Sequence, residues 1–318
     1  MKIALVIFIT LALAGCALLS LHMGVIPVPW RALLTDWQAG HEHYYVLMEY
    51  RLPRLLLALF VGAALAVAGV LIQGIVRNPL ASPDILGVNH AASLASVGAL
   101  LLMPSLPVMV LPLLAFAGGM AGVILLKMLA KTPQPMKLAL TGVALSACWA
   151  SLTDYLMLSR PQDVNNALLW LTGSLWGRDW SFVKIAIPLM ILFLPLSLSF
   201  CRDLDLLALG DARATTLGVS VPHTRFWALL LAVAMTSTGV AACGPISFIG
   251  LVVPHMMRSI TGGRHRRLLP VSALTGALLL VVADLLARII HPPLELPVGV
   301  LTAIIGAPWF VWLLVRMR

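Results

Sequence analysis

Two aspartates, Asp154 and Asp284, stand inside long apolar stretches of this 318-residue sequence. A carboxylate inside a membrane is costly, so such a residue indicates an ion or proton site by default. Asp284, however, has Arg288 four residues on, on the same face of a helix, and an intrahelical ion pair near the outer end of a span accounts for both. The sequence shows no further residues that would complete a proton relay.

Other reactive chemistry is sparse. The sequence contains no GxxxxGK[ST] phosphate-binding loop and no HExxH motif, and its eight histidines are dispersed. The four cysteines form no CxxC pair and lie in or beside apolar runs, which favours packing roles. They are Cys16, Cys148, Cys201 and Cys243. We therefore predict no catalytic residue, no metal site and no cofactor, and we expect that the chain is not an enzyme.

The stretch 201–227 (CRDLDLLALGDARATTLGVSVPHTRFW) is too polar to be a membrane span, yet it contains two short apolar clusters. Gly210 separates the clusters, and Gly218 and Pro222 close the second, which predicts two short helices. One interpretation is an interfacial helix lying on lipid. The other is a docking element whose apolar residues enter a groove on a soluble partner.

The elements that position these residues follow from composition. With 61% hydrophobic and 10% charged residues, against about 25% charged in soluble domains, the chain is predicted to be an all-α polytopic membrane protein. The net charge is +9, but the sequence has no basic runs interleaved with aromatic residues, which would indicate nucleic-acid binding. Crossing a bilayer takes about 20 apolar residues. Ten spans are predicted, of which the third and eighth are short: 3–24, 54–75, 86–103, 107–127, 138–158, 181–200, 227–243, 246–260, 268–290 and 297–316.

Two local patterns refine this organisation. LALAGC, ending at Cys16, is similar to a lipoprotein cleavage box, but the apolar run continues beyond it, so we predict a first span and no removable signal. Small residues crowd the second span, and Gly118 and Gly122 form a GxxxG in the fourth, which predicts helices packed against protein. The half-apolar segment 163–178 is predicted to be an interfacial helix.

The distribution of Lys and Arg predicts the orientation. If the N-terminus is inside, fourteen of the 21 basic residues fall in inside segments. This bias predicts that both termini are cytoplasmic and places 201–227 in the cytoplasm. Arg51 and Arg54 oppose the trend, because they fall at an outer end, where snorkelling to lipid headgroups is one explanation.

Several long motifs resemble one family. The sequence is similar to the permease subunits of bacterial ABC importers for iron chelates and vitamin B12, in order from about residue 50 to the C-terminus. Within the family it looks most like permease subunits of ferric dicitrate importers. The motifs are RLPR (51–54), NPLASPDILGV (78–88), ALGDARATTLGV (208–219), GPISFIGLVVPHMMR (244–258), ADLLAR (283–288) and ELPVGVLTAIIGAPWFVWLL (295–314).

This resemblance implies a type II ABC importer architecture in the bacterial inner membrane, with residues 1–318 as one transmembrane permease domain. The implied partners are a second permease subunit, a different chain, two cytoplasmic ATPase subunits that hydrolyse ATP, and a periplasmic binding protein. The implied function is import of an iron(III) chelate, ferric dicitrate, by alternating access. Another siderophore, haem or vitamin B12 is the alternative substrate, and a gradient-driven secondary carrier or a membrane-embedded enzyme or scaffold is the alternative class.

The resemblance also implies two sets of site residues. The coupling helices, at about 203–219, would contact the ATPases through Leu209, Gly210, Asp211, Ala212, Arg213, Leu217 and Gly218. Acidic residues of the binding protein would dock on Arg51, Arg54 and Arg288, because charge complementarity sets register and association rate.

Overall fold

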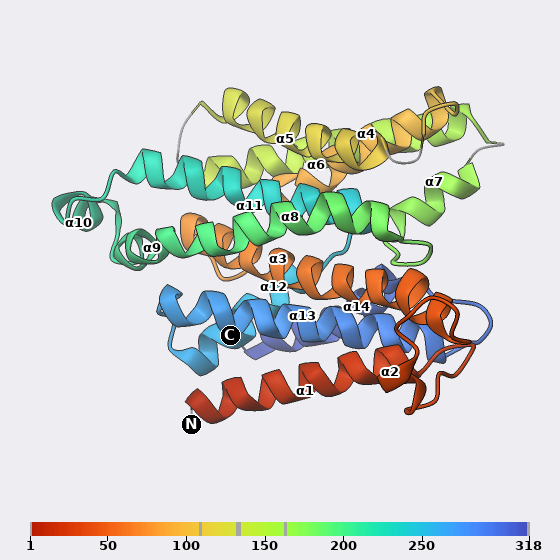
Figure 1. The fold of residues 1–318 in the computed structure, drawn as a ribbon. Helices are drawn as coiled ribbons and strands as arrows, with labels where there is room; N and C mark the ends of the chain where they lie inside the picture. Colours follow the sequence, from red (N-terminus) through yellow and green to blue (C-terminus); the bar gives the residue numbers. More distant parts are fainter. Residues whose placement is uncertain (1, 108–109, 132–134, 162–163, 317–318) are drawn as a thin grey trace.

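The computed structural model describes residues 2–107, 110–131, 135–161 and 164–316, and in these ranges the regular structure is helical. A π-helical turn, Tyr45–Arg51, leads directly into α3. The long helices lie side by side as a bundle (Figure 1). The α-helices are α1 Lys2–His22, α2 Ala32–Thr35, α3 Leu52–Val76, α4 Val88–Leu102, α5 Leu111–Ala130, α6 Pro135–Ser159, α7 Val164–Leu171, α8 Trp180–Ser197, α9 Cys201–Leu207, α10 Asp211–Thr216, α11 Val221–Cys243, α12 Ile249–Thr261, α13 His265–Ile289 and α14 Val298–Arg316.

Each of the ten predicted spans coincides with one of these helices. Seven described helical segments are long and apolar enough to cross a membrane. The spans predicted to be short are confirmed as such, since α4 has 15 residues and α12 has 13. Residues 108–109, at the start of the predicted 107–127 span, lie outside the described ranges, as does Asp163 at the start of the segment that contains α7.

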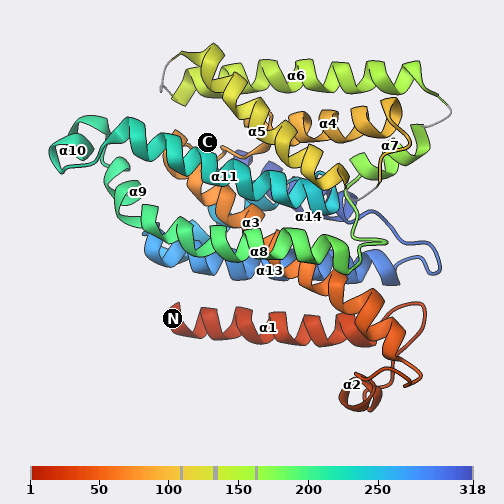
Figure 2. The ribbon, with the colours of Figure 1, turned by 45° about the horizontal axis from the view of Figure 1, so that its top comes forward.

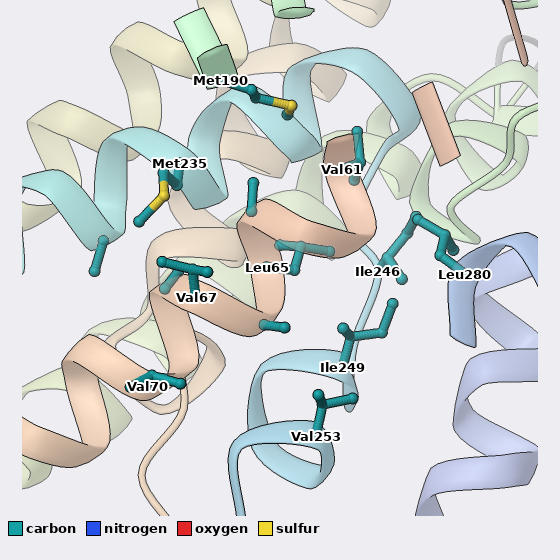
Figure 3. Packing of buried hydrophobic residues seen from close by; sticks show 14 of the residues in the cluster. Val61, Leu65, Val67, Val70, Met190, Met235, Ile246, Ile249, Val253 and Leu280 are labelled. Carbon is teal, nitrogen blue, oxygen red and sulfur yellow. The ribbon is translucent and has the colours of Figure 1, made fainter. Parts of the chain in front are cut away.

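Helix α3 is the centre of the bundle. Its residues are apolar all round, and 83% of its apolar window is buried, as expected for a helix with protein on every side. Figure 3 shows Val67 of α3 beside Met235 of α11, with Ile249 of α12 and Leu280 of α13 on neighbouring helices. The helices next to α3 therefore carry the core.

Small residues bring the central backbones together. A Cβ added at Gly62 would overlap the backbone oxygen of Gly276 on α13, and one added at Gly69 would overlap Gly250 on α12. Gly118 meets α4 in the same way, with a Cβ 2.8 Å from the carbonyl oxygen of Ala91. The predicted packing of these small-residue faces against protein is confirmed, and it follows from the absence of side-chain bulk.

The peripheral helices expose their apolar surface. In the apolar windows of α1 and α6 only 11% and 17% of the residues are buried. Both termini lie on the same side of the bundle as α9 and α10, and α2 lies on the opposite side (Figures 1 and 2). Below, the end that carries α9 and α10 is called the coupling end, after the role predicted for 203–219, and the end that carries α2 is called the outer end.

Candidate functional site

Two short helices project from the coupling end, as the 201–227 sequence predicted. Gly210 separates α9 from α10 with φ 101° and ψ 154°, a conformation that residues other than glycine avoid. Gly218 has φ 86°, and its N–H donates to the carbonyl of Thr215 at 3.0 Å. The glycines therefore set both the break between the helices and the end of α10. Residues 201–219 are called the coupling segment.

The coupling segment has an apolar inner face and an exposed outer face. Leu204, Leu207 and Ala214 are fully buried against the bundle. Leu209 and Leu217, by contrast, are each 50% exposed. Of the other residues predicted to contact an ATPase, Ala212, Arg213 and Gly218 are exposed, whereas Gly210 and Asp211 are half-buried. The segment thus offers apolar area outward while its inner side stays anchored.

A network of charges lies at the outer end between α3, α13 and the loop before α14. The Arg54 Nε donates to Asp284 Oδ1 at 2.7 Å, and its Nη1 donates to Glu295 Oε2 at 2.5 Å. Asp284 Oδ2 lies 3.3 Å from Arg288, which confirms the predicted intrahelical pair. Arg288 also donates to the Ser20 carbonyl at 3.1 Å and to the Ser20 hydroxyl. Together, the carboxylates of Asp284 and Glu295 offset the charges of Arg54 and Arg288 inside the protein.

Arg51 extends this network toward the N-terminal helix. Its guanidinium donates to the backbone carbonyls of Leu21, His22 and Ile26, at 2.9 Å for His22. The Tyr50 hydroxyl donates to Glu295 at 3.2 Å. These contacts tie α1 and the segment after it to the start of α3.

The three arginines predicted to dock a binding protein therefore share one end of the molecule, but their side chains point inward. Arg51 is 3% exposed, and Arg54 and Arg288 are each 2% exposed. Sequence reasoning missed the Arg54–Asp284 and Arg54–Glu295 pairs. Their members are 230 and 241 residues apart, so no local pattern could have indicated them.

A cavity of about 310 Å³ whose lining includes several polar side chains lies where α4, α6 and the α11–α12 connection meet. Asp154 lines it and is exposed. Asp84 and Asn89 also line it, and their side chains are hydrogen-bonded to each other. His90 and Ser247 also line it. Sequence reasoning found Asp154 but not its neighbours. Within the described ranges, no group of three or more His, Cys, Asp or Glu side chains is arranged to hold a metal ion.

Comparison with known proteins agrees with this architecture. Residues 10–316 match the FecCD transport family. The chain is 99% identical, over all 318 residues of both chains, to the Fe(3+) dicitrate transport system permease protein FecD of Escherichia coli (strain K12). It is 43% identical over 312 residues to the Fe(3+)-citrate import system permease protein YfmE of Bacillus subtilis (strain 168), covering 97% of this chain and 94% of that one.

A solved structure shares the fold. It is an inward-facing conformation of a metal-chelate type ABC transporter, with a TM-score of 0.88 and 29% sequence identity, over 99% of this chain and all of the other. The seven long apolar helices, the shorter ones between them and the matched residues all agree with a membrane-spanning transporter subunit. The chain belongs to the FecCD transport family and is a permease subunit of an ABC importer.

Proposed function

We propose that this permease moves iron(III) dicitrate from the periplasm to the cytoplasm. The observation that carries the proposal is the 99% identity to the Escherichia coli permease FecD across the full length of both chains. Other relatives, at 38–40% identity, are named for hydroxamate and hemin transport. Membership of the family alone therefore does not identify the transported chelate. The near-identity to FecD favours iron(III) dicitrate.

ATP hydrolysis comes from two separate ATPase subunits that dock at the coupling segment. The chain lacks a phosphate-binding loop of its own. The half-exposed Leu209 and Leu217 support this assignment, since they offer apolar area in a segment otherwise anchored to the bundle. Closure of the ATPases moves the segment, and the spans rock to open the path on one side and then the other. The rest of the proposed contact is Gly210, Asp211, Ala212, Arg213 and Gly218.

The coupling end faces the cytoplasm of a bacterium, with the chain in the inner membrane as one permease domain paired with a different permease chain. The bias of Lys and Arg toward this end supports the orientation. Both termini share the end with α10 (Figures 1 and 2).

A periplasmic binding protein docks at the outer end, where Arg51, Arg54 and Arg288 gather. Since these side chains are buried, acidic residues of the partner would act by competing with Asp284 and Glu295 for Arg54 and Arg288, and with backbone carbonyls for Arg51. Exchange of one carboxylate for another keeps the buried Arg54 and Arg288 paired throughout.

The decisive experiment is uptake of radiolabelled ferric citrate by cells that lack the chain, with and without its restoration. Uptake that disappears and returns supports the substrate. Unchanged uptake contradicts it, and the same cells would then be tested with ferric hydroxamate, haem and vitamin B12.

A matched pair of glycine variants tests the coupling role. Gly210 and Gly40 both have φ 101°, at the coupling end and in the outer loop respectively. Gly210→Ala strains the coupling segment and is expected to lower uptake per ATP hydrolysed. Gly40→Ala applies a similar strain at the other end and is expected to leave that ratio unchanged. Equal ratios in the two variants would contradict the coupling assignment.

A further inference from the structure

The aspartates of the coupling segment are bonded to the membrane helices. Asp203 accepts from the hydroxyl of Thr224 on α11 at 2.8 Å. Asp205 accepts from His265 on α13, and Asp211 accepts from Arg225 on α11. Each carboxylate of the segment thus reaches a helix that crosses the membrane.

Asp205 holds the first residue of α13 by two bonds. Its Oδ1 accepts from the His265 backbone N–H at 3.0 Å and from the ring Nδ1 at 2.6 Å. The first N–H groups of a helix have no partner within it, so a side-chain carboxylate there satisfies one of them and favours the helix terminus. Because His265 is buried, these two bonds hold α9 against the start of α13.

Asp211 joins three elements through one carboxylate. Arg225 donates to both of its oxygens, at 3.0 and 2.9 Å, in the bidentate geometry that gives Arg–carboxylate pairs their directionality. The guanidinium of Arg77, the residue directly after α3, lies 3.0 Å from the same carboxylate. The start of α10 is therefore linked to the start of α11 and to the end of α3.

The helices reached in this way are the most buried spans. In their apolar windows 83% of the residues are buried for α3 and α11, and 67% for α13. The three carboxylate contacts described above go to α11, α13 and the end of α3, and not to peripheral α6, whose apolar window is 17% buried. Because α3 and α13 meet through glycine backbones at Gly62 and Gly276, a displacement applied to these helices moves closely packed surfaces together.

We propose that Asp205 and Asp211 are positioning residues that tie the coupling segment to α3, α11 and α13, so that its movement is passed to the buried bundle. The proposal rests on the proposed coupling function. It moves Asp211 from the proposed ATPase contact to the transmission, which the two carboxylates carry, while the exposed leucines make the contact with the ATPase. A residue that transmits movement affects how much transport each hydrolysed ATP produces, whereas a contact residue affects whether the ATPase stays bound.

The test uses the complete importer in proteoliposomes, with ATP inside and binding protein with radiolabelled ferric citrate outside. Asp211→Asn keeps the shape of the side chain and removes its charge. It is expected to retain the ATPase subunits and their hydrolysis rate while uptake per ATP falls about two- to fivefold, the effect of one partly exposed ion pair. Asp205→Asn is expected to act in the same direction, and Asp211→Glu, which restores the charge, is expected to recover part of the loss.

Arg202→Gln is the matched control, because Arg202 is an exposed charge on the same segment with no role in the tethers. It is expected to leave uptake per ATP unchanged. If Asp211→Asn does not accumulate in membranes, Arg77→Gln removes only the α3 branch and is judged by the same ratio.

Two results would overturn the tether assignment alone: an unchanged ratio in the Asp variants, or loss of the bound ATPase subunits, which would place Asp211 in the contact itself. Uptake by the unsubstituted importer that proceeds without ATP would overturn the proposed function together with the tethers.

Discussion

Removal of the Asp284 carboxylate is expected to destabilise the protein more than removal of any other single charge at the outer end. Asp284 is 1% exposed and contacts two guanidinium groups, those of Arg54 and Arg288, which are each 2% exposed. The cluster holds three arginines and two carboxylates, so Asp284→Ala raises its net charge from +1 to +2. This charge is buried where water cannot screen it.

The expected loss of stability depends on which partners each arginine keeps. Breaking a buried ion pair by removing one partner costs about 3–5 kcal/mol, because the other charge is left uncompensated. In Asp284→Ala, Arg54 keeps Glu295 and Arg288 keeps Ser20, so the lower half of that range, about 3–4 kcal/mol, is expected. Glu295→Ala leaves the more deeply buried Asp284 contact of Arg54 in place and is expected to cost about 1.5–3 kcal/mol, the value of one hydrogen bond to a charged group.

The assay is unfolding of the purified full-length chain in mixed detergent micelles, followed by circular dichroism as the denaturing detergent is raised. The double variant Arg54→Met with Asp284→Leu removes both charges and fills their volume. Its loss is expected to be smaller than the sum of the two single losses by about 1–3 kcal/mol. Additive losses, or an Asp284→Ala variant as stable as the parent, would refute the assignment of this pair as a mutually dependent buried contact.

Two further predictions concern the close helix contact and the outer loop. Gly62→Ala is expected to cost about 1–3 kcal/mol or more in the same unfolding assay, because its Cβ would overlap the α13 backbone; Gly15→Ala, with open space around it, is the control, and equal losses would contradict the contact. Hydrogen bonds from Thr35 and His43 lower the pKa of Asp36 from its ordinary value of 3.8. Because the pKa of Asp36 is depressed in the folded state, the stability that these hydrogen bonds contribute is present at pH values above the ordinary pKa and is lost as the pH falls below it. The hydrogen-exchange protection factors of residues 32–44, which correct for the intrinsic pH dependence of exchange, are therefore expected to fall on acidification, and an equal fall in Asp36→Asn would refute the role of the carboxylate.

Local patterns along the sequence were sufficient for the helices and for the break between α9 and α10. Ten apolar runs coincide with ten helices because hydropathy and length are properties of the run itself. Gly210 marked the break because a backbone near φ 101° is accessible to glycine and strained for other residues. The Asp284–Arg288 pair was equally local, since four residues make one helical turn.

The tertiary structure decided which of these helices form the centre and what the arginines contact. Helices α3 and α6 are both apolar runs, yet α3 is enclosed while α6 is peripheral, because close backbone packing at Gly62 and Gly69 joins α3 to its neighbours. Docking of a binding protein on Arg51, Arg54 and Arg288 stays a prediction, but only the structure shows that Arg54 lies between Asp284 and Glu295. Such pairings depend on how whole helices pack, and helix packing is a sum of contacts between residues hundreds of positions apart that no window of sequence contains.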